Sequence, residues 1–75
     1  MTTDYYDQLS EKNRGIVNQT IGMEKAAAIE LIEKNDMHVF IAQEDDLRFF
    51  KTTDLDFTRA NLVIKNGKIT DADVG

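Results

Sequence analysis

Two hydrogen-bond donors directly follow a segment rich in acceptors in the last third of the chain. Arg59 and Asn61 are two residues apart, and strand side chains alternate between faces, so both donors project from one face of a strand. Residues 52–58 contain three Thr and two Asp but neither Gly nor Pro. We interpret the two donors as braces that hold an exposed loop in one extended shape. The opposite strand face would build the core through Ala60, Leu62 and Ile64.

Other residues that could do chemistry carry weaker signals. The only histidine, His38, heads an apolar run, where a structural role is the common one. Asp45-Asp46 and the Asp54/Asp56 pair fit a solvated turn and a polar loop better than an acid–base pair or a calcium site. The sequence holds no Ser-His-Asp order, metal-ligand spacing or phosphate-binding glycine loop. We therefore expect no enzyme, no catalytic residue, no cofactor and no metal site.

Length and composition limit the remaining function classes. Seventy-five residues make one small domain with a small core. The absence of cysteine excludes a disulfide or a thiol nucleophile, and it mildly favours a cytoplasmic location. The net charge of −5, with scattered basic residues, gives nucleic-acid binding little support. Without a long apolar run we expect no membrane span and no signal peptide.

The clearest helix covers residues 23–34, which consist mainly of strong helix formers. Its apolar stripe has the spacing i, i+3, i+4 at Ala28, Leu31 and Ile32. We expect this stripe to pack on a sheet through Val39 or Phe40, Ile41, Leu62 and Ile64.

The N-terminal third carries a less regular pattern. Residues 1–15 are polar and predict an N-terminal arm or a short helix over 4–12. Residues 16–21 lie between two glycines and predict a short extended piece. We therefore divide the chain into residues 1–15 and a single domain over 16–75.

Two strong strands are predicted at 39–42 and 62–65: the first is rich in β-branched and aromatic residues, and the second is an apolar run with two β-branched residues. Asn66-Gly67 is a strong hairpin signal and predicts a short antiparallel strand over 68–70. Residues 47–51 leave two alternatives open. Either they form a third strand that hairpins onto 38–42, or they belong to a crossover 43–60 between two parallel strands. Parallel pairing needs a crossover of about a dozen residues or more, and this one is long enough.

Residues 19–75 resemble the potato type I inhibitor family of serine-protease inhibitors, especially its bacterial, disulfide-poor relatives. The resemblance rests on five pieces that occur in the family's order. They are Ile21-Gly22 before the helix, Val39-Phe40-Ile41, Thr52-Thr53-Asp54-Leu55, Arg59-Ala60-Asn61-Leu62 and the final Asp73-Val74-Gly75.

The resemblance implies an α+β fold: one helix on a small mixed sheet, with an exposed loop crossing between two parallel strands. It implies a binding loop of Thr52, Thr53, Asp54 and Leu55, with the scissile bond between Thr53 and Asp54. Arg59 would donate hydrogen bonds to Thr52 and Asp54, and Asn61 would be the second brace. The implied partner is a subtilisin-like or elastase-like serine protease.

An alternative is a non-inhibitory binding protein, such as a phage-type accessory or anti-defence factor that sequesters a host protein or a small signalling ligand. In that interpretation Arg48, Phe49, Phe50 and Lys51 form an apolar, weakly basic interface, which could also serve a homodimer.

Overall fold

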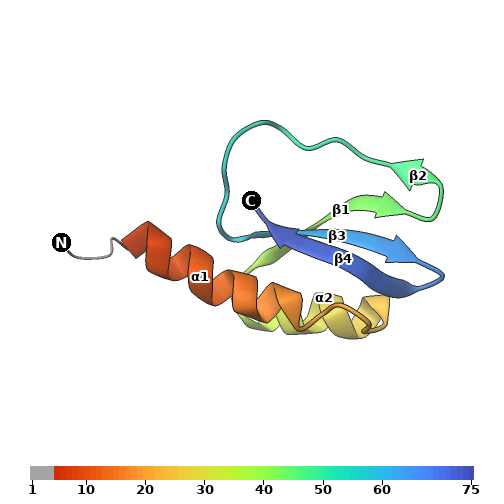
Figure 1. The fold of residues 1–75 in the computed structure, drawn as a ribbon, viewed down its shortest axis with the longest axis horizontal. Helices are drawn as coiled ribbons and strands as arrows, with labels where there is room; N and C mark the ends of the chain where they lie inside the picture. The colour runs from red at the N-terminus through yellow and green to blue at the C-terminus, as the bar shows by residue number, and fades with distance from the viewer. Residues whose placement is uncertain (1–4) are drawn as a thin grey trace.

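The computed structural model describes residues 5–75, with side chains from residue 8 onward. Its elements in chain order are α1 (Tyr5–Asn18), α2 (Lys25–Lys34), β1 (His38–Glu44), β2 (Leu47–Arg48), β3 (Arg59–Lys65) and β4 (Lys68–Val74). Both helices lie on the same side of one four-stranded mixed sheet (Figure 1). The predicted α+β class is confirmed, with two helices in place of one.

The order of strands in the sheet is β2-β1-β3-β4, and the central pair β1 and β3 is parallel. His38 pairs with Arg59 and Ile41 with Leu62, so the parallel pairing predicted for these segments is confirmed. The hairpin predicted at Asn66-Gly67 is also confirmed, since both residues have positive φ angles of 53° and 78°. Strand β4 is longer than the expected 68–70.

Residues 47–51 satisfy part of each alternative. Leu47 and Arg48 form a two-residue strand antiparallel to the end of β1. The Phe49 amide still donates to the carbonyl oxygen of Ala42 at 2.9 Å, after which the chain leaves the sheet. The crossover between the parallel strands therefore runs over residues 49–58. It begins later than the predicted residue 43, because the short hairpin of β1 and β2 comes first.

The core lies between the helices and the sheet. Ala60, Leu62 and Ile64 are at most 1% exposed, as the alternation in β3 predicted. Ala28 and Ile32 of α2 are fully buried, but Leu31 is only half-buried and lies outside the core cluster, contrary to the prediction. The other core residues are Val17, Met37, Ile69, Ala72 and Val74.

The extended piece predicted at 16–21 is wrong. Helix α1 runs through residue 15 to Asn18, and turns follow over 19–22. Ser10, Asn13 and Val17, spaced three and four apart, are all buried. Packing of this helical face outweighs the strand preference of Ile16 and Val17, which is a weak local preference. The helix predicted over 4–12 is thus longer than expected, and residue 4 lies outside the described residues.

Candidate functional site

The crossover 49–58 arches away from the sheet between β2 and β3, and the end of the chain at Gly75 lies inside the arch (Figure 1). The predicted binding-loop residues Thr52, Thr53, Asp54 and Leu55 are all exposed and belong to no helix or strand. The middle of the crossover, which bends at Thr53 and Asp54, is therefore open to solvent.

Arg59, the first residue of β3, supports the arch from its base. Its side chain is only 10% exposed. Nη2 donates to the backbone oxygen of Asp54 at 2.8 Å, and Nε donates to the backbone oxygen of Gly75 at 2.8 Å. The guanidinium is therefore fixed at two points, and one of them is the residue after the predicted scissile bond.

Asn61 has a different role from the one expected. Its Nδ2 donates to the same Gly75 oxygen at 2.9 Å, and no hydrogen bond links it to the loop in the described part of the chain. The Gly75 amide in turn donates to the backbone oxygen of Arg59 at 3.1 Å. Asn61 thus holds Gly75, and Gly75 helps to hold Arg59, so its bracing of the loop is indirect.

The contact expected between Arg59 and Thr52 is replaced by one within the loop. The Thr52 hydroxyl donates to the Asp54 carboxylate, bridging the two residues on either side of Thr53. The pKa of Asp54 lies below its ordinary value of 3.8, chiefly because of this bond and then because of the backbone N–H of Asp54 itself. The Arg59 guanidinium, with Nη1 4.0 Å from Oδ2, adds to the effect.

A second set of contacts fixes the return of the loop to the sheet, and sequence reasoning missed it. Asp56 Oδ1 accepts from the Thr58 hydroxyl at 2.6 Å and from the Thr58 amide at 2.9 Å. Its other oxygen lies 3.1 Å from His38 Nε2. The Thr58 hydrogen bonds, first the hydroxyl and then the amide, lower the pKa of Asp56. An Asp two residues before a Thr is a recognisable Asx-turn signal that could have predicted this.

Helix α1 also reaches the loop. Asn13 Nδ2 donates to the backbone oxygen of Phe57 at 2.7 Å, and Asn13 is 2% exposed. The loop is therefore held on its return side from α1, β1 and β3, whereas residues 49–55 stay exposed.

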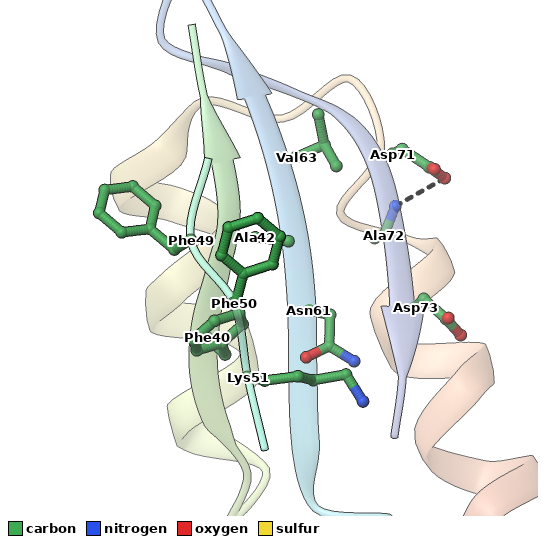
Figure 2. A pocket seen from close by; sticks show the side chains of 10 residues that line it. All are labelled: Phe40, Ala42, Phe49, Phe50, Lys51, Asn61, Val63, Asp71, Ala72 and Asp73. Atoms are coloured by element: carbon green, nitrogen blue, oxygen red, sulfur yellow. Dashed lines mark hydrogen bonds between the residues drawn. The ribbon is translucent and has the colours of Figure 1, made fainter. Parts of the chain in front are cut away.

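The second predicted interface, Arg48, Phe49, Phe50 and Lys51, is exposed along its whole length. Residues 49–51 run in front of β1, where they border a groove of about 400 Å³ on the sheet face opposite the helices (Figure 2). Phe40 and Asn61 line its floor, and Asp71 and Asp73 of β4 line its far side. Residues 49–51, but not Arg48, thus line a groove together with the sheet, and the floor of this groove includes Asn61, which also bonds to Gly75.

The described residues hold no cluster of three or more His, Cys, Asp or Glu side chains suited to a metal ion. Among residues 5–75, neither helix is long and apolar enough to cross a bilayer.

Comparison of the chain with protein-family models, with curated proteins and with solved structures found no match.

Proposed function

We propose that this protein is a serine-protease inhibitor that presents residues 52–55 to a subtilisin-like or elastase-like enzyme. Thr53 enters the primary specificity pocket, and the Thr53–Asp54 bond lies at the catalytic serine. The enzyme cuts this bond slowly, because Arg59 holds the residue that follows it and the Thr52–Asp54 contact spans it.

The observation that carries the proposal is the hydrogen bond from Arg59 Nη2 to the Asp54 carbonyl oxygen at 2.8 Å. Asp54 provides the amine side of the scissile bond, so a bond to its carbonyl restrains the part of the chain that must depart after cleavage. Arg59 is buried and also bonded to Gly75, so this restraint is attached to the sheet. The Thr52–Asp54 contact adds a restraint across the bond itself.

Pre-organisation explains how a small domain could bind tightly. Ordering one backbone residue costs about 1–2 kcal/mol, and a free peptide would lose this on entering a cleft. A hydrogen bond to a charged group contributes about 1.5–3 kcal/mol, which offsets part of the ordering before the protease arrives. Because the loop is already ordered, binding loses less conformational entropy, and a larger part of the contact energy appears as affinity.

Intact-mass spectrometry tests the proposal. The protein is incubated with an equimolar subtilisin-class or elastase-class enzyme, and the cleavage products are followed with time. We expect one slow cut, between Thr53 and Asp54, with most of the chain intact and enzyme-bound. Rapid cutting at several bonds of residues 49–58 would identify the loop as an ordinary substrate and reject the inhibitor.

A second candidate is the non-inhibitory binder, favoured by the groove beside residues 49–51. Its volume of about 400 Å³ falls within the range of small-molecule sites. Phe40, Phe49 and Phe50 line its apolar part, and Lys51, Asp71 and Asp73 supply charged groups. Capture of interacting proteins and small molecules from a host lysate by the wild type, with Phe50→Ala and Lys51→Glu as controls, would identify such a partner by mass spectrometry. Capture that both variants retain would reject the groove as its site.

A further inference from the structure

The two most exposed large apolar side chains of the described residues lie on either side of the Thr53–Asp54 bond. Phe50 is 91% exposed and Leu55 is 75% exposed. Single exposed apolar residues are common and need no explanation. Here, however, two of them occupy one crossover, three residues before Thr53 and two residues after it, in the segment that the fold presents most openly.

The fold itself makes little use of the Phe50 ring. Its ring lies at the edge of the groove over the sheet (Figure 2), yet the residue remains 91% exposed, so it buries little of its surface there. Leu55 lies near Gly75, with its Cδ2 3.9 Å from where a Cβ at residue 75 would stand, and it also stays largely exposed. Both side chains are therefore available to a partner that encloses the loop.

Thr53 alone is a weak anchor for such a partner. Its side chain has few apolar atoms to bury, and apolar burial is what fills a primary pocket. A Phe side chain buries about 150–250 Å², a substantial part of the roughly 800 Å² that an inhibitor of standard size contributes. Most of the apolar contact area on this loop therefore stands outside the primary pocket.

We propose that Phe50 is the principal affinity anchor of the loop, with Leu55 as a second anchor on the far side of the scissile bond. This inference rests on the proposed inhibitor function and names its target class. The target is a serine protease whose cleft has a small primary pocket and an apolar subsite about 10 Å away, since three extended residues span about 10 Å. A smaller apolar subsite lies on the other side. A cleft contacts an extended chain from more than one side, so it can receive both Phe50 and Thr53.

Inhibition constants of three variants test the inference against a protease that the wild type inhibits. Phe50→Ala should weaken inhibition about 10- to 100-fold, the range expected from removing one buried aromatic side chain. Leu55→Ala should weaken it several-fold. Leu47→Ala is the matched control, because Leu47 is 66% exposed but lies in β2, outside the crossover. It should change inhibition less than about twofold. Thermal melts of all three variants should match the wild type.

The outcomes separate the inference from the function on which it rests. If the wild type inhibits and Phe50→Ala inhibits equally well, the anchor is wrong and the inhibitor stands. If Leu47→Ala weakens inhibition as much as Phe50→Ala does, residues 47–51 act as one patch, and the assignment of Phe50 as the principal anchor is again wrong. If the wild type slows no protease of either class, both proposals fail.

Discussion

Arg59 Nη2 donates a hydrogen bond to the backbone oxygen of Asp54 at 2.8 Å, joining a buried strand residue to an exposed loop. Most of the crossover lacks secondary structure, and its remaining restraints lie near its ends. This bond reaches the middle, beside the Thr53–Asp54 peptide. Its geometry is set by Gly75, whose carbonyl oxygen accepts from both Arg59 and Asn61.

Replacing Arg59 should convert a slow substrate into a fast one. Arg59→Ala removes both the Asp54 and the Gly75 hydrogen bonds, so we expect at least about tenfold faster cleavage between Thr53 and Asp54. Loss of these charge-assisted bonds should also lower the free energy of unfolding by about 2 kcal/mol. Arg48→Ala is the control, since Arg48 is exposed and pairs with Gln43, near the opposite end of β1 from His38, the partner of Arg59. Equal cleavage rates for Arg59→Ala and wild type would remove Arg59 from the bracing role.

Leu62 should be essential for stability. It is fully buried at the centre of β3, and truncating a buried Leu to Ala costs about 2–5 kcal/mol. Against a typical total of about 5–15 kcal/mol, Leu62→Ala should leave the domain near its unfolding threshold in a denaturant melt. Leu47→Ala, on an exposed strand, should stay within about 0.5 kcal/mol of wild type. A Leu62→Ala melt that close to wild type would contradict the core.

This core was predictable because it depends on local patterns. Alternation in β3 separates Ala60, Leu62 and Ile64 from Arg59 and Asn61, and the Asn66-Gly67 turn places β4 beside it. Helix α1 was harder, because Ile16 and Val17 favour strands locally and only their packing against the sheet makes them helical. No local pattern reveals that Leu31 stays outside the buried core cluster.

The braces were predictable only in part, because local patterns do not reveal contacts between distant segments. The donors on β3 follow from their spacing, but their acceptor at Gly75 is 16 residues from Arg59 and 14 from Asn61. The Asn13–Phe57 bond spans 44 residues. Such hydrogen bonds depend on how distant segments pack against each other in the folded chain, which the local sequence pattern does not determine.

Amide hydrogen exchange should be slow in β3 and fast in the exposed part of the loop. Amides of residues 60–64 lie in a central strand paired on both sides, so they should exchange slowly. Amides of residues 50–55 are exposed and should exchange quickly, with intermediate rates at Thr58 and Arg59, where the loop is hydrogen-bonded. Slow exchange throughout 50–55 would mean that the crossover is covered in solution.

Acid should loosen the return of the loop. The pKa of Asp56 is lowered below 3.8 in the folded protein by its bonds to Thr58. A lowered folded pKa stabilises the fold above the unfolded value, and this contribution is lost as the pH falls through the folded pKa. We therefore expect the Thr58 amide to lose protection below about pH 4. Asp56→Asn should weaken this protection at neutral pH and make it less sensitive to acid. A Thr58 amide unaffected by either change would contradict the Asp56 turn.

The inhibition constant of the wild type and Thr53→Leu, measured on a panel of subtilisin-class and elastase-class proteases, tests the central claim most directly. The wild type should inhibit, at micromolar concentration, enzymes with small or permissive primary pockets. Thr53→Leu should inhibit several-fold more tightly where the pocket accepts Leu, since each additional buried methylene contributes about 0.8 kcal/mol. Failure of both proteins to slow any enzyme of either class at micromolar concentration would contradict the inhibitor and favour the non-inhibitory binder.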